Sequence, residues 1–179
     1  MELNILDWFQ TLHTPILDKI MISITKLGDA GIFWIVLTLL FLIIPKMRKT
    51  GIIMAAALIM DLLICNVAVK NLAARTRPYD VNTSVQLLVA KLHDYSFPSG
   101  HTAASFASVT ALYLAGEKKL WKPALVLACL IAVSRLYLYV HYPTDVLGGV
   151  VIGIIAGYLG YRLVKVLEDK FSRMKNGGE

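Results

Sequence analysis

Three short polar segments in an otherwise apolar chain carry residue types that bind phosphate and transfer it. In chain order they are Lys70-Asn-Leu-Ala-Ala-Arg-Thr-Arg77-Pro78, then Pro98-Ser99-Gly100-His101, and then Ser134-Arg135, followed after five residues by His141 and after three more by Asp145. Ammonium groups and forked guanidinium groups suit a tetrahedral oxyanion such as phosphate. The segments therefore predict a phosphate site.

The positive charge of this site comes from Lys70, Arg77 and Arg135. Ser99 adds a hydroxyl group, and Gly100 lets the backbone approach a ligand closely. The amide of Gly100 lies just before an apolar stretch, and the free amides and the dipole of a helix N-terminus favour an anion. We expect these five residues to form a cradle for a phosphate group that requires no metal ion and no other cofactor.

Two histidines and one carboxylate supply the reactive groups. If the chain is helical at His141, then His141 and Asp145 share one face because they are four residues apart. The carboxylate would keep one ring nitrogen protonated and leave the other free to attack phosphorus. His101 would then protonate the oxygen of the leaving group. The pattern favours phosphoryl transfer through a phosphohistidine.

The elements that position these residues follow from the composition. Of the 179 residues, 57% are hydrophobic and 17% are charged, and the mean hydropathy is +0.65, whereas soluble domains carry about 25% charged residues. This composition predicts an all-α, polytopic membrane helical bundle and excludes a disordered chain. The net charge of +6 does not indicate a nucleic-acid site, because such a site needs a basic face on a soluble domain.

Five apolar stretches are candidate spans of a single membrane-integrated domain, residues 1–179. They cover residues 31–44, 51–69, 102–115, 123–140 and 146–166. Residues 1–27 are more polar and are expected to form an amphipathic segment in the membrane interface, and residues 167–179 are expected to form a cytoplasmic tail. The last stretch carries Gly149, Gly153 and Gly157 on one helix face, a spacing that lets a neighbouring helix pack closely.

Basic residues predict the orientation of the bundle. Eleven of the 18 Lys and Arg residues lie in the connection at 45–50, in the connection at 117–122 and after residue 161. By the positive-inside rule this side is cytoplasmic. The three polar segments then lie at the opposite ends of the spans, so we expect a multi-pass protein of the plasma membrane whose site faces outside the cytoplasm.

With its three segments in this order, the chain resembles the type 2 phosphatidic acid phosphatase family, also called lipid phosphate phosphatases. The resemblance covers the pattern K-x6-RP, PSGH and SR-x5-H-x3-D, from residue 70 to residue 145. One departure is that only five clear spans are present, where many bacterial members have six. The resemblance implies that His141 is the nucleophile, Asp145 its orienting partner and His101 the general acid. Phosphate binding is carried over to Lys70, Arg77, Ser99, Gly100 and Arg135.

The resemblance implies a membrane lipid phosphatase that acts on undecaprenyl diphosphate, phosphatidylglycerophosphate, phosphatidate or a related lipid. Two other functions stay open. One is a phosphotransferase that passes the phosphate from the same phosphohistidine to an acceptor, and the other is a lipid-phosphate binding or transport protein without catalysis. The lipid substrate and the bilayer are the expected partners; no nucleic acid is expected, and the sequence predicts no particular oligomeric state.

Three further features have two interpretations each. Arg75 is expected either to contact the phosphate or to have a structural role, because the family pattern leaves its position open. Asp61 lies within the second apolar stretch, where a carboxylate is costly; a hydrogen bond to a neighbouring helix is favoured over a contact with the path of the lipid. The connection at 79–97 is expected either to cover the site or to form an interfacial helix.

Overall fold

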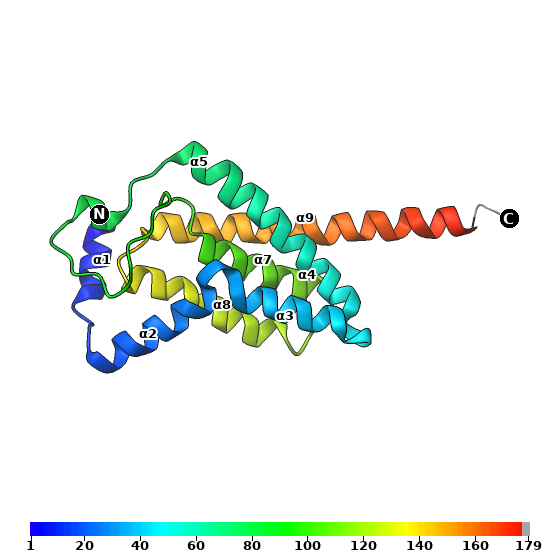
Figure 1. Cartoon of the computed structure of the whole chain (residues 1–179), viewed down its shortest axis with the longest axis horizontal. Coiled ribbons are helices and arrows are strands. Elements are labelled where there is room, and N and C mark those ends of the chain that lie inside the picture. Colours follow the sequence, from blue (N-terminus) through cyan, green and yellow to red (C-terminus); the bar gives the residue numbers. More distant parts are fainter. Residues whose placement is uncertain (177–179) are drawn as a thin grey trace.

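The computed structural model describes residues 1–176, which form a bundle of helices (Figure 1). No β-strand occurs within this part of the chain, so the predicted all-α class is confirmed. The helices, in chain order, are α1 (Glu2–Gln10), α2 (Pro15–Gly28), α3 (Ile32–Ile43), α4 (Arg48–Asp61), a π-helix (Leu62–Val69), α5 (Lys70–Ala73), α6 (Pro78–Val81), α7 (Gly100–Leu114), α8 (Trp121–Tyr137) and α9 (Pro143–Asn176).

Each of the five predicted apolar stretches forms a helix, namely α3, α4 with the π-helix, α7, α8 and α9. Three helical segments are long and apolar enough to cross a membrane: Pro15–Ile43, Pro45–Val81 and Pro143–Lys175. Helices α7 and α8 have 15 and 17 residues. Both are shorter than a full membrane span, which needs about 20 residues. They pack among the three long segments, with α7 between α4, α8 and α9.

The N-terminal segment, residues 1–27, forms α1 and nearly all of α2. Helix α2 joins α3 in the first long segment through a break at Asp29–Gly31. Helix α1 lies across one end of the bundle (Figure 1) and buries Leu6 against that end. At the other terminus, α9 continues through residue 176 and includes most of the predicted tail, while residues 177–179 lie outside the described residues.

The glycine stripe of α9 packs against α7, as predicted from its spacing. A Cβ atom added at Gly153 would lie 2.4 Å from the carbonyl oxygen of Ala103, and one at Gly149 would lie 2.7 Å from that of Ser99. Gly157 meets Thr110 in the same way, at 2.6 Å. Small residues therefore let the two backbones approach closely, and this contact joins the start of α7 to the start of α9.

The direction of the helices brings the polar segments to one end of the bundle. Helices α7 and α9 begin at this end, and α5 and α8 finish there (Figure 1). The basic segments meet at the opposite end, where Lys49 pairs with Glu168 at 2.7 Å and Thr50 donates a hydrogen bond to Glu117 at 2.6 Å. As predicted from the sequence, the three polar segments therefore lie at one end of the bundle and the basic connections at the other.

Candidate active site

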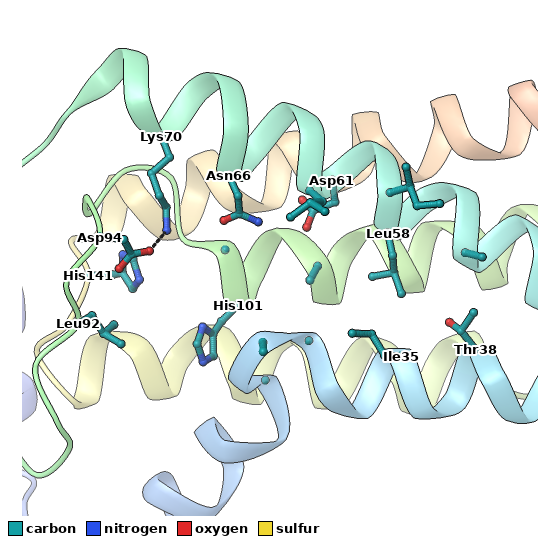
Figure 2. Close-up of a pocket in the computed structure, with 18 of the residues that line it drawn as sticks. Ile35, Thr38, Leu58, Asp61, Asn66, Lys70, Leu92, Asp94, His101 and His141 are labelled. Atoms are coloured by element: carbon teal, nitrogen blue, oxygen red, sulfur yellow. Dashed lines mark hydrogen bonds and ion pairs between the residues drawn. The ribbon is translucent and has the colours of Figure 1, made fainter.

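A cavity of about 600 Å³ begins at the polar end of the bundle and extends between α3 and α4. Five of the predicted site residues line it, together with Asp94, which the sequence did not single out (Figure 2). The five are Lys70, Arg77, Gly100, His101 and His141. The structure therefore brings all three polar segments to the wall of one cavity.

His141 and Asp145 meet, but not on one face of a helix. His141 lies in the turn between α8 and α9, so the condition under which the two residues would share a helix face is not met. Helix α9 begins at Pro143, and Asp145 in its first turn reaches back to accept a hydrogen bond from the backbone N–H of Tyr142 at 2.8 Å, as in the return half of a capping box. This cap turns the carboxylate toward the histidine, and Nδ1 of His141 lies 3.5 Å from Oδ2 of Asp145.

The contacts of His141 favour one protonation state. Its Nε2 lies 3.3 Å from Nη1 of Arg77, and a guanidinium group only donates hydrogen bonds. In this contact Nε2 must therefore offer its lone pair, which leaves the proton on Nδ1, the side of Asp145. Burial and the charges of Arg135 and Arg77 lower the pKa of His141 well below its usual range, against the opposing effect of Asp145. The ring is neutral, as a nucleophile must be.

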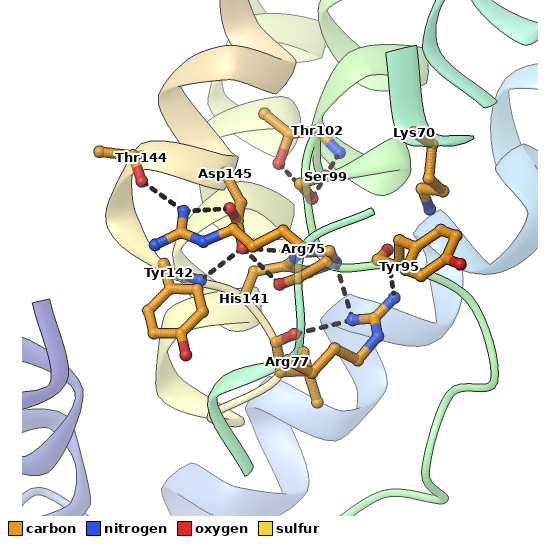
Figure 3. A network of polar contacts seen from close by, with 12 residues as sticks. Lys70, Arg75, Arg77, Tyr95, Ser99, Thr102, His141, Tyr142, Thr144 and Asp145 are labelled. Atoms are coloured by element: carbon orange, nitrogen blue, oxygen red, sulfur yellow. Dashed lines mark hydrogen bonds and ion pairs between the residues drawn. The ribbon is translucent and has the colours of Figure 1, made fainter. Parts of the chain in front are cut away.

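Asp145 is fully buried and held from several sides (Figure 3). It accepts hydrogen bonds from the hydroxyl of Ser96 and from Nη1 of Arg75, the latter at 2.6 Å. Arg75 also pairs with Glu2 of α1 and stacks its guanidinium 3.9 Å from the centre of the Tyr142 ring. Of the two interpretations of Arg75, the structural role is the one that these contacts support.

Lys70 and Arg77 share a carboxylate. The ammonium group of Lys70 donates to Oδ2 of Asp94 (Figure 2), and Nη2 of Arg77 donates to Oδ1 at 2.6 Å. Burial opposes the ionisation of Asp94, but the hydrogen bond and charge of Lys70, with those of Arg77, lower its pKa to about 2. Two of the predicted phosphate ligands are therefore already arranged around an anion.

Gly100 and Ser99 lie at the start of α7; Gly100 lines the cavity, whereas Ser99 is fully buried beside it in the chain. A Cβ atom at Gly100 would lie 3.0 Å from Oδ1 of Asn66 and 3.9 Å from Nζ of Lys70, so a side chain there would fill the space beside the ammonium group. Ser99 is the N-cap of α7, and its buried hydroxyl accepts a hydrogen bond from the hydroxyl of Thr102 at 3.0 Å. Its own proton stays available to a phosphate oxygen.

Arg135 lies in the last turn of α8 and is almost fully buried. One of its nitrogens, Nη1, donates to the hydroxyl of Thr25, and its Nε has no hydrogen-bond partner within residues 1–176. A buried charged donor without a partner is costly. Arg135 is not among the residues that line the cavity, but its charge acts on both His101 and His141.

His101 lies in the first turn of α7, beside the break between α2 and α3 (Figure 2). Its Nε2 lies 2.8 Å from Oδ1 of Asp29 in that break. This partner could not be predicted from the sequence, because residues 29 and 101 belong to segments that share no motif. The structure thus contains a second pair of histidine and carboxylate at the same cavity.

The rest of the cavity is an apolar groove between α3 and α4. Its walls carry Ile35, Leu39, Leu42, Leu58, Ile59 and Leu62. Asp61 interrupts this surface; its side chain is buried, and its Oδ1 has no hydrogen-bond partner within the described residues. The favoured hydrogen bond from Asp61 to a neighbouring helix is therefore missing at this atom, and the contact with the path of the lipid is the better interpretation.

The connection at 79–97 covers the polar end of the cavity. Apart from residues 79–81, which end α6, it is not helical, so the alternative of an interfacial helix was wrong. Tyr79 anchors it by donating a hydrogen bond to the carbonyl of Leu92 at 2.8 Å. Leu92 and Asp94 line the cavity. The segment thus forms part of the site.

The fold and the site together define a helical membrane protein built around a phosphate-transfer centre. The chain belongs to the PAP2 superfamily, whose family model matches residues 50–169. This match confirms the resemblance found in the sequence. It also confirms the enzyme class, a membrane lipid phosphatase of the PAP2 type.

Three similar proteins illustrate this membership. An undecaprenyl-diphosphatase of Sulfolobus acidocaldarius is 31% identical over 147 residues, which are 82% of this chain and 70% of the relative. The crystal structure of Aquifex aeolicus LpxE matches with a TM-score of 0.78 and 28% identity, over 90% of this chain and 94% of the other. A PAP2-type phosphatidylglycerolphosphate phosphatase of Bacillus subtilis matches with a TM-score of 0.70 and 29% identity, over 93% and 84% of the two chains.

Proposed function

We propose that this protein removes a phosphate group from a membrane lipid phosphate or diphosphate at the extracytoplasmic face of the plasma membrane. One observation carries the proposal: a single cavity joins Lys70, Arg77 and both histidines to an apolar groove between membrane helices. The charged part suits the phosphate, and the groove suits a hydrocarbon chain. The collection of basic residues at the other end of the bundle supports the orientation.

The first step transfers the phosphoryl group to His141. Nε2 of His141 attacks phosphorus, the bond from phosphorus to the leaving oxygen breaks, and His101 gives its proton to that oxygen. Asp145 holds the Nδ1–H of His141 and offsets the positive charge that the ring gains as the N–P bond forms. Lys70, Arg77 and Arg135, with the hydroxyl of Ser99 and the amide of Gly100, bind the phosphoryl oxygens.

The second step hydrolyses the phosphohistidine. A water molecule gives a proton to His101 and attacks phosphorus, the N–P bond breaks, and inorganic phosphate leaves. His141 returns to its neutral form and His101 to its protonated form, so the two steps together consume one water molecule. Positive side chains offset the charge of the transferring group throughout, a task that Mg²⁺ performs in kinases and GTPases.

The apolar groove provides the place for the lipid chain. Several of its side chains, among them Ile35, Leu39 and Leu62, are exposed although they line the groove. The groove therefore opens toward the bilayer, and a lipid can enter sideways with its phosphate leading. The names of the similar proteins make undecaprenyl diphosphate and phosphatidylglycerophosphate the first substrates to test, followed by phosphatidate.

The test is phosphate release by the purified protein in detergent, with these three lipids as substrates. We expect phosphate release from at least one of these lipids in the presence of excess EDTA. When the lipid phosphate carries ³²P, quenching the reaction with alkali should leave a ³²P-labelled phosphohistidine on the protein. His141→Ala should abolish both signals, while His93→Ala, a change to an exposed histidine of the covering segment, should keep them.

Three results would refute the proposal. They are a labelled phosphoenzyme that persists in His141→Ala, activity that requires added Mg²⁺ after EDTA, and lipid binding without turnover in the unaltered chain. The last result would point to a binding or transport protein. Transfer of the label to an added alcohol in preference to water would identify a phosphotransferase instead.

A further inference from the structure

The break between α2 and α3 faces the imidazole ring of His101. Asp29, the first residue of the break, places Oδ1 2.8 Å from Nε2 of this ring. The two residues lie 72 positions apart and on different helices. This is the only carboxylate within hydrogen-bond distance of His101 in the part of the chain that the structure describes.

The backbone of the break is shaped for this contact. Ala30 and Gly31 both adopt left-handed conformations, with φ values of 49° and 68°. For alanine such a conformation is strained, and strain of this kind persists where the surrounding structure requires it. Without these two left-handed residues, α2 would continue directly into α3, and the backbone would not turn at Asp29.

The residue before Asp29 also fits the ring closely. A Cβ atom at Gly28 would lie 2.7 Å from Cδ2 of His101 and 3.0 Å from Cγ2 of Ile131. The ring therefore lies directly on the backbone of Gly28, between α2 and α8. A carboxylate at one ring nitrogen and a backbone surface against one ring edge together fix the orientation of the imidazole.

Two positive charges act on the ring from a distance. Arg135 and Lys70 both act on His101 electrostatically, and Asp29 is the negative charge that opposes them. A general acid must carry a proton on the nitrogen that faces the leaving group. A carboxylate on the other nitrogen holds the ring in position and offsets its charge when both nitrogens are protonated, which is the task of the aspartate in the catalytic triad of serine proteases.

We propose that Asp29 is the positioning residue of the general acid, and that the break at residues 28–31 exists to present it to His101. This inference rests on the general-acid role of His101 in the proposed function. In the first step the proton leaves Nδ1 of His101 for the departing oxygen as the P–O bond breaks, while Nε2–H stays with Asp29. In the second step Nδ1 takes a proton back from water.

The experiment compares two substrates that differ in how much their leaving group needs a proton. A short-chain phosphatidate releases an alkoxide and needs the acid, whereas p-nitrophenyl phosphate releases a stable phenolate and needs it much less. His101→Ala should lose roughly 10²–10⁴-fold in kcat on phosphatidate, and far less on p-nitrophenyl phosphate. Asp29→Asn should show the same selectivity with a smaller loss, in kcat rather than KM.

Two further variants make the comparison specific. In Asp29→Asn/His101→Ala the loss should not exceed that of His101→Ala, because residues that act as a unit are not additive. Asp18→Asn is the matched control: it removes a carboxylate of the preceding helix α2, which accepts a hydrogen bond from the hydroxyl of Tyr137, and it should affect both substrates equally or not at all. The side chain of Asp29 is 58% exposed, so its asparagine variant should fold.

The outcomes separate the inference from the function on which it rests. Equal losses on both substrates in Asp29→Asn, or additive losses in the double variant, would show that Asp29 only supports the fold. If His101→Ala itself shows no preference between the leaving groups, the general-acid role of His101 is wrong, and Asp29 has nothing to position. Selective loss in His101→Ala with full activity in Asp29→Asn would refute the inference alone.

Discussion

Asp94 is the residue that must move before a substrate can use the whole cradle. Its carboxylate binds both Lys70 and Arg77, the side chains that we expect to bind phosphate. Because its pKa is lowered to about 2, Asp94 is ionised at neutral and at mildly acidic pH. Mild acidification therefore does not remove the negative charge with which Asp94 competes against phosphate for Lys70 and Arg77.

Removing the charge of Asp94 should tighten the binding of phosphate analogues. In Asp94→Asn the incoming anion no longer displaces a charged hydrogen-bond acceptor, a contact worth about 1.5–3 kcal/mol. We expect vanadate to inhibit p-nitrophenyl phosphate hydrolysis at about tenfold lower concentration, equal to about 1.4 kcal/mol. Asp80→Asn, which alters an exposed carboxylate near Lys91, is the control. Weaker inhibition in Asp94→Asn would mean that Asp94 holds the two cations in place instead.

The residues of the three polar segments could be predicted from the sequence, whereas the carboxylates that contact them could not. Lys70, His101 and His141 were predictable because phosphate chemistry demands their residue types in a known pattern. Asp29 and Asp94 were not predictable, because each carboxylate becomes meaningful only through a contact with a distant segment. Nothing in their neighbourhood in the sequence distinguishes them from surface carboxylates.

At the scale of elements, the close contact of α7 with α9 sets the distance between the two ends of the site. Gly153→Ala would place a methyl group 2.4 Å from the carbonyl oxygen of Ala103, so the helices must separate. Overpacking of this kind typically costs 1–3 kcal/mol. We expect a lower midpoint of thermal unfolding and reduced activity. Val151→Ile adds one carbon on the exposed face of α9, and its midpoint should not change; equal midpoints for both variants would contradict the prediction.

A second prediction at this scale concerns the groove between α3 and α4, which we expect to hold the lipid chain. Ile35→Trp should fill the groove beside Leu58 (Figure 2). Since an overpacked site costs roughly 1–3 kcal/mol, kcat/KM for a long-chain lipid should fall by about 10-fold to 100-fold. Hydrolysis of p-nitrophenyl phosphate, which has no chain, should continue. Val36→Trp, at the next residue but outside the cavity wall, is the control, and a loss on both substrates would place the chain elsewhere.

The elements themselves were largely predictable, and the connections were not. Apolar stretches identify helices because the bilayer requires them, and the spacing of Gly149, Gly153 and Gly157 correctly predicted a packing face. The turn at His141 and the extended segment after Val81 depend on tertiary contacts, such as the cap of Asp145 on Tyr142 and the anchor of Tyr79 on Leu92. Neither contact follows from local propensity.

At the scale of the whole molecule, the unequal distribution of basic residues predicts the orientation in the membrane. In a background without Cys65 and Cys129, Lys46→Cys and Ser84→Cys place one thiol at each end of the bundle, both at exposed positions. In intact cells an impermeant thiol reagent should label the cysteine at 84 and spare the one at 46. After permeabilisation both should react. Labelling of position 46 alone in intact cells would place the site on the cytoplasmic face.

The π-helix between α4 and α5 decides which residues share the wall of the cavity. An α-helix turns by about 100° per residue, so Asp61 and Lys70, nine positions apart, would point in opposite directions. The wider turns of the π-helix bring both into the cavity, with Asn66 between them (Figure 2). The π-helix therefore changes the direction of the Lys70 side chain relative to that of Asp61, so that both point into the cavity. A chain shortened by one residue here, with α-helical turns throughout, would still cross the bilayer, yet its lysine would be rotated by about 80° from the direction of Asp61.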